Sequence, residues 1–244
     1  MVKSKNSIQF EIQEKLSFVI AKFSEDKDAP SSYNIAWAAH LTNEFGEAQF
    51  PLALLWLHAN QNEDGSWGSF NKSSFYSDRI LSTFKALTAL KEWSDRGTSG
   101  LDTAIEMGMR FLNQSLSQVK ERDSFPIGVG TLLPKLFLEA KRTGLRFEEH
   151  NEWLDQLVQK HKAKLALVPS TMIHNRSTAF LYALECFEEE VLDWNRILTL
   201  QENDGSFVSS PSTTAFVYQQ TKDEKCLAYL QNVWASYGYM PEFS

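Results

Sequence analysis

Few residues of this chain have the types and spacing that metal-ion or acid–base chemistry requires. Cys186 and Cys226 lie 40 residues apart and belong to no CxxC-type pair, so the sequence argues against a zinc site or a disulfide framework. Two buried thiols in a reducing compartment are the simpler interpretation. The densest acidic run, Glu25-Asp26-Lys27-Asp28, lies in a polar, proline-containing stretch and is typical of a solvated loop.

Charge and composition exclude several classes of protein. The 244 residues carry a net charge of −7, which leaves no basic footprint for DNA or RNA, so a phosphate ligand would have to be held by individual lysines or arginines. With 43% hydrophobic residues spread along its length, the chain is typical of a globular protein. Its N-terminus runs into a helical pattern without an apolar signal segment, and no run of about 18 apolar residues follows. We therefore expect a cytoplasmic protein with no membrane span.

Helical periodicity dominates the segments that must position any site. Apolar residues recur at three- and four-residue steps from Ile8 to Phe23, which predicts an amphipathic helix. Further helices are expected from Asp78 to Gly97, over 101–116, 126–141, 177–187 and 191–200, from Pro211, and from Asp223 to about Gly238. Almost no period-2 alternation occurs, so we predict an all-α protein.

A seven-residue segment occurs twice and is the most informative feature of the sequence. Gln61-Asn62-Glu63-Asp64-Gly65-Ser66-Trp67 recurs 140 residues later as Gln201-Glu202-Asn203-Asp204-Gly205-Ser206-Phe207. The Asp-Gly pair predicts a tight turn, the glutamine can satisfy helix-terminal backbone groups, and the aromatic ring can close the turn against a neighbouring helix. We expect a structural rather than a catalytic role. The spacing is too long for a solenoid unit and suggests two related helical domains.

The repeated segment is similar to the QW motif of squalene–hopene cyclases, oxidosqualene cyclases and the class II part of diterpene synthases. From about Tyr33 to Glu242, further segments follow the order seen in copalyl diphosphate synthases. They include Phe50-Pro51, Asp78-Arg79, Pro126-Ile127-Gly128, Val168-Pro169, Leu184-Glu185, Leu192-Asp193-Trp194, Ser210-Pro211-Ser212, Thr221-Lys222-Asp223 and Tyr229-Leu230. The chain is therefore identified as a member of the class II, protonation-initiated terpene cyclases.

The resemblance implies two α/α-barrels, with a γ domain inserted after the first helical stretch of a β domain. Residues 1–45 are then expected to open the β domain, residues 46–190 to form the γ barrel, and residues 191–244 to continue an incomplete β domain. The implied substrate is a linear prenyl diphosphate such as geranylgeranyl diphosphate, which would bind between the barrels and be cyclised to a bicyclic diphosphate.

The acid that starts this reaction is missing from the sequence. In the family it is the middle Asp of an Asp-x-Asp-Asp motif, where neighbouring groups keep one carboxyl protonated. The 244 residues contain no such motif, and the class I motif Asp-Asp-x-x-Asp is absent too. We expect that this chain alone does not protonate a prenyl chain. A second chain, or sequence C-terminal to Ser244, would have to complete the β domain.

Three positions match functional positions of the family. Lys164 matches a lysine that contacts the substrate diphosphate, although its cluster with His161 and Lys162 is also typical of a solvated face. Tyr182 and Glu242 fall where plant ent-type enzymes place the histidine and asparagine of the catalytic base pair. A Tyr–Glu pair departs from that pattern, which puts an ent-copalyl product in doubt. Tyr182 could instead be a core residue, and Glu242 could belong to a frayed terminus.

Two further features leave alternatives open. The acidic, Mg²⁺-linked stretch of the family is reduced here to Lys120-Glu121-Arg122-Asp123, and Gly130 stands where a glutamate is expected, so Mg²⁺ dependence is in doubt. Besides the cyclase hypothesis, the chain could be a non-catalytic, degenerate module that binds an isoprenoid or a partner chain. A protein prenyltransferase subunit would need an Asp/Cys/His zinc set, which the two distant cysteines do not provide.

Overall fold

The computed structural model describes residues 29–69, 76–119, 127–147, 152–175 and 180–242. Within these ranges the regular elements are all helices, which confirms the all-α prediction. The helix expected over 8–23 and the clusters at 25–28 and 120–123 lie outside the described residues. No helix in the described ranges is long and apolar enough to cross a membrane.

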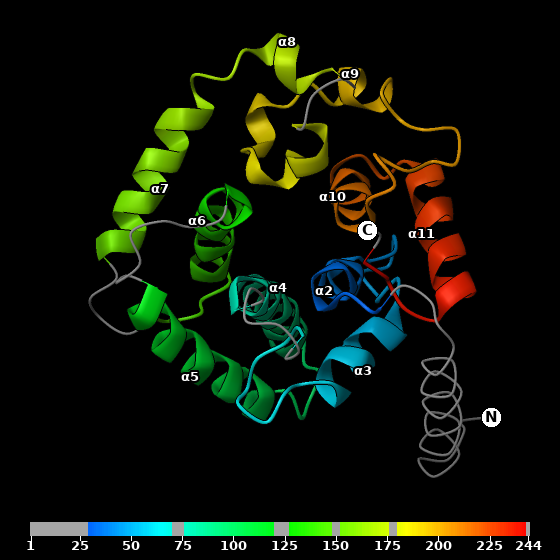
Figure 1. Cartoon of the computed structure of the whole chain (residues 1–244). Coiled ribbons are helices and arrows are strands. Elements are labelled where there is room, and N and C mark those ends of the chain that lie inside the picture. The colour runs from blue at the N-terminus through cyan, green and yellow to red at the C-terminus, as the bar shows by residue number, and fades with distance from the viewer. Residues whose placement is uncertain (1–28, 70–75, 120–126, 148–151, 176–179, 243–244) are drawn as a thin grey trace, which may run out of the picture.

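The described helices form two concentric layers (Figure 1). The inner layer consists of α2 (Ser32–His40), α4 (Tyr76–Asp95), α6 (Ile127–Arg142), the 3-10 helix η2 (Leu181–Cys186) and α10 (Pro211–Thr221). Each of these helices packs on the next in chain order, and α10 packs back on α2. The inner layer is therefore a closed ring, as expected for an α/α-barrel.

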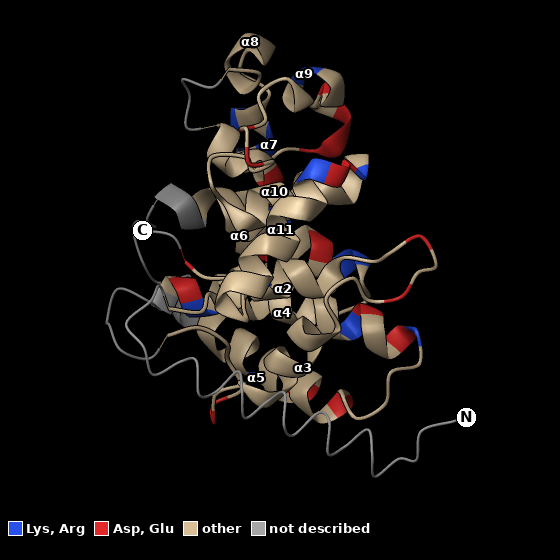
Figure 2. Cartoon of the chain, turned by 90° about the vertical axis from the view of Figure 1, so that its right-hand side faces the viewer, with Lys and Arg blue, Asp and Glu red and all other residues tan. Residues whose placement is uncertain are grey.

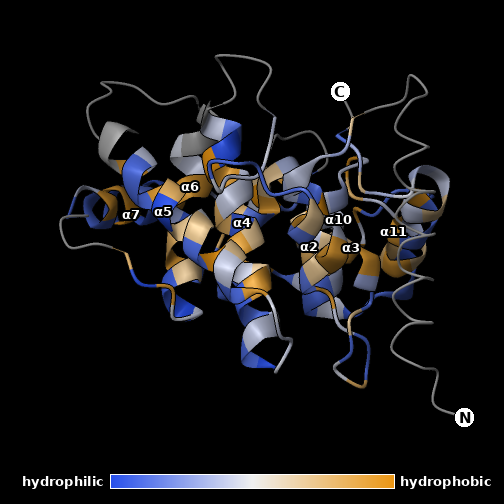
Figure 3. Cartoon of the chain, turned by 90° about the horizontal axis from the view of Figure 1, so that it is seen from below, coloured by the Kyte–Doolittle hydropathy of each residue, from blue (hydrophilic) through white to orange (hydrophobic). Residues whose placement is uncertain are grey.

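The outer layer surrounds this ring. It consists of α3 (Pro51–Ala59), α5 (Asp102–Val119), α7 (Glu152–Leu165), the short helices α8 (Ser170–Ile173), η3 (Glu189–Val191) and α9 (Trp194–Leu198), and α11 (Glu224–Tyr237). Helix α3 packs on α2, α5 on α4, α7 on α6, and α11 on α10. Charged residues lie mainly at helix ends and in loops (Figure 2), whereas hydrophobic residues concentrate on the packed bodies of the helices (Figure 3).

Capping residues and a glycine mark the ends of α10 and α11 at the positions that the sequence predicts. The Ser210 hydroxyl accepts a hydrogen bond from the Thr213 backbone N–H, and Pro211 occupies the first turn of α10. The Asp223 carboxylate caps α11, which ends at Gly238 with a φ of +80°. The expected helix over 177–187 is instead the 3-10 helix η2, in which Ala183 has a non-helical backbone.

Aromatic contacts close the ring between its first and last helices. The Trp37 ring on α2 meets the Phe216 ring on α10 edge-on at 5.8 Å between centroids, and the Trp194 ring meets Phe216 at 5.6 Å. The Ser31 backbone N–H donates to the Met240 carbonyl at 3.0 Å. Residues near both ends of the described chain therefore share one core.

This packing differs from the expected start of a second barrel in residues 191–244. The described part of that segment supplies α9, α10 and α11, which complete the ring begun by α2. The expected boundaries at 45/46 and 190/191 fall inside continuous packing because α2 contacts both α4 and α10. As a division of a longer protein into domains, the three-part scheme stays a prediction.

The two repeat turns, residues 61–67 and 201–207, occupy equivalent positions in the ring, each between an outer helix and the next inner helix. The Gln61 amide donates to the Gly65 and Ala104 carbonyls at 2.9 and 2.8 Å. The Gln201 amide donates to the Gly205 carbonyl at 3.1 Å and to the Asp223 carboxylate at 2.8 Å. Each glutamine thus ties its turn to the start of an outer helix, α5 or α11.

The aromatic end of each repeat turn is tied to an inner helix. The Trp67 backbone N–H donates to the Thr83 hydroxyl on α4, and the Phe207 backbone N–H donates to the Thr214 hydroxyl on α10. Both aromatic rings are fully buried. These contacts confirm the structural role predicted for the repeat, although both turns lie in one ring and not in separate barrels.

Candidate functional site

A cavity of about 330 Å³ opens at one end of the ring. Its wall includes Tyr33 near the start of α2, Asp78 near the start of α4, Thr131 in the first half of α6 and Ser212 at the start of α10. Because residues near the starts of these inner helices meet at one cavity, the helices run in the same direction. We call this space the N-terminal cavity.

The N-terminal cavity brings together Tyr182 and Glu242, two of the three residues predicted from the sequence. Tyr182 lies on η2 and its side chain is exposed, so it is not a core residue. The Glu242 backbone N–H donates to the Ala29 carbonyl at 3.0 Å, which fixes this residue beside the start of α2. Partial burial raises the pKa of the Tyr182 phenol, and the negative charges of Glu185 and Glu242 raise it further.

Two more carboxyl groups line the same cavity. Glu185 is only 5% exposed, and burial raises its pKa to about 7. A hydrogen bond from the Glu185 backbone N–H, the Lys85 charge and the hydroxyls of Thr213 and Ser212 partly oppose this rise. Burial also raises the pKa of Asp78, and the charge of Glu242 adds to the effect.

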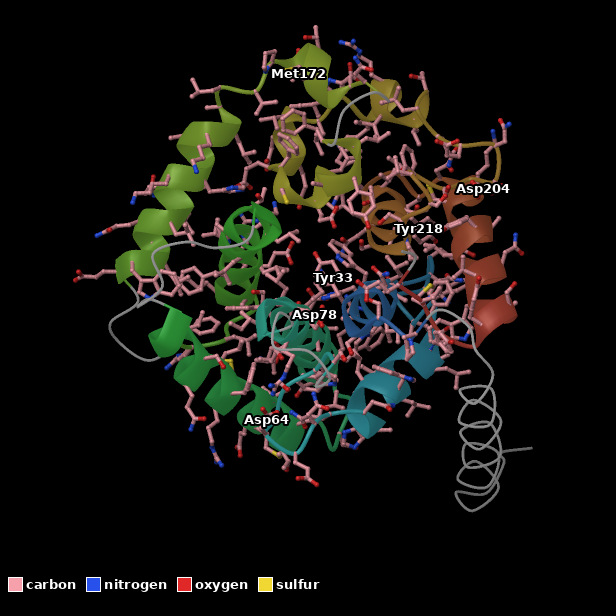
Figure 4. The ribbon with its side chains drawn as sticks, viewed as in Figure 1. Tyr33, Asp64, Asp78, Met172, Asp204 and Tyr218 are labelled. Atoms are coloured by element: carbon pink, nitrogen blue, oxygen red, sulfur yellow. The ribbon has the colours of Figure 1, made fainter. Side chains whose placement is uncertain are left out.

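Tyr33 adds a phenol to the centre of the ring, near Asp78 (Figure 4). Its hydroxyl is buried. The Trp37 indole N–H faces the phenol oxygen and acts to lower its pKa, but no described residue accepts the Tyr33 proton within hydrogen-bond distance. Burial raises the pKa of this phenol well above its usual value, and Glu185 is the next largest cause. A buried donor without a protein partner is uncommon and points to a ligand or an ordered water.

Lys164, the third predicted residue, lies elsewhere. It is exposed at the end of the outer helix α7 and does not line the N-terminal cavity. Its neighbours have structural partners: the His161 ring is 3.1 Å from the Cys186 carbonyl, and the Lys162 ammonium is 3.7 Å from the Glu188 carboxylate. The proposed contact between Lys164 and a diphosphate stays a prediction.

A second, polar cavity of about 250 Å³ lies at the opposite ends of the inner helices. The buried Lys85 ammonium is 3.1 Å from the Glu139 carboxylate and 3.4 Å from the centre of the Trp37 ring. The His40 ring contacts Glu92 at 3.0 Å and, through its other nitrogen, the Thr88 hydroxyl at 3.0 Å. These side chains are paired with one another by an ion pair and hydrogen bonds, and the pairs link neighbouring inner helices of the ring.

No group of three or more His, Cys, Asp or Glu side chains suited to a metal ion occurs in the described ranges. The reduced acidic stretch at 120–123 lies outside those ranges. Cys186 and Cys226 are both buried free thiols, as the sequence predicts, and burial raises the pKa of each.

Sequence reasoning missed Tyr33, Asp78 and Glu185 as site residues. Asp78 and Glu185 lie in segments that carry the family resemblance, but nothing in their spacing shows that they meet. The signal that could have identified Glu185 is an acidic residue between Leu184 and Cys186, in a stretch that is otherwise suited to a core.

The two-layered ring, the paired turns and the N-terminal cavity define an α-barrel of the terpene cyclase type. No protein-family model matches the chain. The chain is 39% identical over 214 residues to a bifunctional diterpene synthase of Selaginella moellendorffii, an alignment that covers 86% of this chain and 24% of that protein. It is 34% identical to a bifunctional levopimaradiene synthase of Ginkgo biloba, with 98% of this chain and 28% of that protein covered. Both relatives are named as chloroplastic.

Solved structures agree with these relatives. The ent-copalyl diphosphate synthase of Arabidopsis thaliana, in complex with an aza-geranylgeranyl thiolodiphosphate analogue, matches with a TM-score of 0.78 at 30% identity, over 94% of this chain and 33% of that one. Abietadiene synthase of Abies grandis matches with a TM-score of 0.79 at 31% identity, over 99% and 31%. The chain belongs to the class II terpene cyclase family, and its homologues are diterpene synthases. It spans about a quarter to a third of their length.

Proposed function

We propose that this chain supplies one wall of a class II diterpene cyclase active site. In that site a linear prenyl diphosphate such as geranylgeranyl diphosphate is protonated and closed to a bicyclic diphosphate. The observation that carries the proposal is the N-terminal cavity, in which Tyr182 and Glu242 meet although they are 60 residues apart in the sequence. These are the positions that the family resemblance links to the quenching of the final carbocation.

Some of the catalytic groups belong to this chain, and the acid belongs to sequence outside it. The acid comes from an Asp-x-Asp-Asp motif outside these 244 residues, either in the same polypeptide or in a second chain. Tyr182 and Glu242 border the cavity mouth, where a phenol and a carboxylate can hold the water nearest to the cation. Lys164 contacts the diphosphate as a point charge.

The location of the protein stays a prediction. The sequence led us to expect a cytoplasmic protein, and the two relatives named above are chloroplastic. Expression of the full gene fused to a fluorescent protein, followed by imaging against a plastid marker, decides between these compartments.

Substitution of the cavity residues in a complemented enzyme tests the proposal. The chain is combined with the Asp-x-Asp-Asp-bearing part of the protein and incubated with geranylgeranyl diphosphate. Tyr182→Phe and Glu242→Gln are expected to change the ratio of bicyclic products. Phe45→Ala, in an exposed loop away from the cavity, should leave the ratio unchanged. Equal product ratios for all variants would contradict the site, and binding of an isoprenoid without any turnover would favour the non-catalytic alternative.

A further inference from the structure

Glu185 is the most deeply buried carboxyl group of the N-terminal cavity. It lies three residues beyond Tyr182 on η2, past the non-helical Ala183, while Glu242 is exposed at the cavity mouth. The Thr213 hydroxyl on α10 is 3.4 Å from the Glu185 carboxyl and also donates to the Tyr182 carbonyl at 3.1 Å. No ion pair joins Glu185 to a described lysine, arginine or histidine; its polar contacts are a backbone N–H and the hydroxyls of Thr213 and Ser212.

Tyr33 faces the same space from α2. Its hydroxyl is buried and, although the Trp37 indole N–H faces the phenol oxygen, no described residue accepts its proton. After burial, the Glu185 charge is the largest cause that raises its pKa. A buried acceptor and an unsatisfied buried donor therefore line one cavity of about 330 Å³. This arrangement has room for a water or a ligand between the two groups.

We propose that Glu185 is the proton acceptor that ends the cyclisation. This inference rests on the proposed function and assigns its last step to a residue that the family resemblance does not single out. A C–H bond beside the cationic carbon breaks, its electron pair forms the C=C bond of the product, and the proton passes to a Glu185 carboxylate oxygen. The transfer is direct or runs through one water held by the Tyr33 hydroxyl. The proton then leaves to solvent past Tyr182 and Glu242.

The protonation states of the cavity groups favour Glu185 over Tyr182 as the acceptor. The Tyr182 phenol has a pKa raised above its usual value of 10, so it is protonated at neutral pH and has no anionic oxygen to accept a proton. Burial holds the pKa of Glu185 at about 7, where a general base is most effective near neutral pH. Glu242, in contrast, is exposed and solvated.

Several charged or titratable groups surround Glu185 and enter any pH dependence. They are Tyr33 from α2, Asp78 and Lys85 from α4, Glu139 from α6, Tyr182 and Cys186 from η2, and Glu242 from the C-terminal segment. Among them the Lys85 charge acts to lower the pKa of Glu185. Helix α10 contributes the uncharged hydroxyls of Ser212 and Thr213.

The test measures how the final cation partitions between loss of a proton and capture by water. A cation that is not deprotonated takes up water and becomes an alcohol. In the complemented enzyme, Glu185→Gln is expected to lower the ratio of alkene to alcohol products at least 100-fold, which is the low end of a general-base contribution. Glu185→Asp, which keeps a carboxylate, should restore most of the alkene. Glu190→Gln, the same exchange at an exposed position, should match the wild type.

The pH profile separates an acceptor from a residue that only supports the fold. In the wild type the alkene-to-alcohol ratio should rise as pH increases through about 7, because Glu185 ionises over that range. In Glu185→Gln the ratio should be low and independent of pH. If the wild type cyclises the substrate but Glu185→Gln keeps the wild-type ratio and pH profile, the role of Glu185 is refuted and the proposed function stands. If the complemented wild type forms no cyclic product, the proposed function and the role of Glu185 are both refuted.

Discussion

Replacing Gly205 by alanine tests whether the repeat turn is a structural joint of the ring. Gly205 has a φ of +91°, a conformation that costs other L-residues about 1–2 kcal/mol. An added Cβ would lie 2.2 Å from the Lys225 carbonyl oxygen, so the turn or helix α11 must shift. Overpacking of this kind costs about 1–3 kcal/mol. We expect Gly205→Ala to lower the free energy of unfolding by about 2–5 kcal/mol, which lowers the Tm by about 4–20 °C in a chain of this length.

Two further glycine variants separate the cost of the steric clash from the cost of the positive φ in the free energy of unfolding. Gly97 has a φ of +95° but no atom within 4 Å of an added Cβ, so Gly97→Ala should lose only the conformational part. Gly65 is the equivalent of Gly205 in the first turn, with an added Cβ 2.3 Å from the Met107 carbonyl oxygen, so Gly65→Ala should match Gly205→Ala. Thermal unfolding is followed by circular dichroism at 222 nm. A loss in Gly205→Ala no larger than in Gly97→Ala would refute the reasoning.

Three other perturbations have expected magnitudes. Asp223→Ala removes the carboxylate that caps α11 and binds Gln201, and should cost about 1–2 kcal/mol in urea unfolding. Lys85→Ala leaves the Glu139 carboxylate without its buried partner and should lower the free energy of unfolding by about 3–5 kcal/mol. Lys91→Ala, which breaks the exposed pair with Asp95, should lower it by less than about 1 kcal/mol. Similar losses for the two variants would contradict the argument from burial. Burial raises the pKa of Glu185 from 4.5 to about 7 in the folded protein, so Glu185 ionises at lower pH in the unfolded chain than in the folded one. As the pH rises from 4.5 to about 7, this residue therefore lowers the free energy of unfolding, by on the order of 3 kcal/mol in total. Glu185→Gln should therefore gain stability relative to the wild type between pH 5 and pH 7.5, and parallel pH curves for the two proteins would count against the raised pKa.

Three long helices were predictable because apolar residues recur in them at three- and four-residue steps. Helices α4, α5 and α6 lie close to the ranges expected from their apolar stripes. Helix α2 was not predicted because it has only 9 residues and nearly all of them are buried, so its short sequence has no polar face to reveal the period. Helix α7 was also missed, since only Leu154, Val158 and His161 of its residues are buried.

Closure of the ring could not be derived from local sequence. The repeat is visible in the sequence, but its spacing predicts two related helical domains, whereas both described turns lie in one ring. The contacts between Trp37 and Phe216, which place both ends of the described chain in one core, join positions that no periodic pattern relates. The same holds for Tyr33 and Glu185, which meet only because α2 and η2 face one cavity.

The most direct test of the account is a cyclisation assay with separated components. Geranylgeranyl diphosphate is incubated with this chain alone, with the Asp-x-Asp-Asp-bearing part alone, and with both, and the dephosphorylated products are analysed by gas chromatography with mass spectrometry. The account predicts a bicyclic product only from the combined components, and none when the middle Asp of the motif is changed to Asn. A bicyclic product from this chain alone would contradict it.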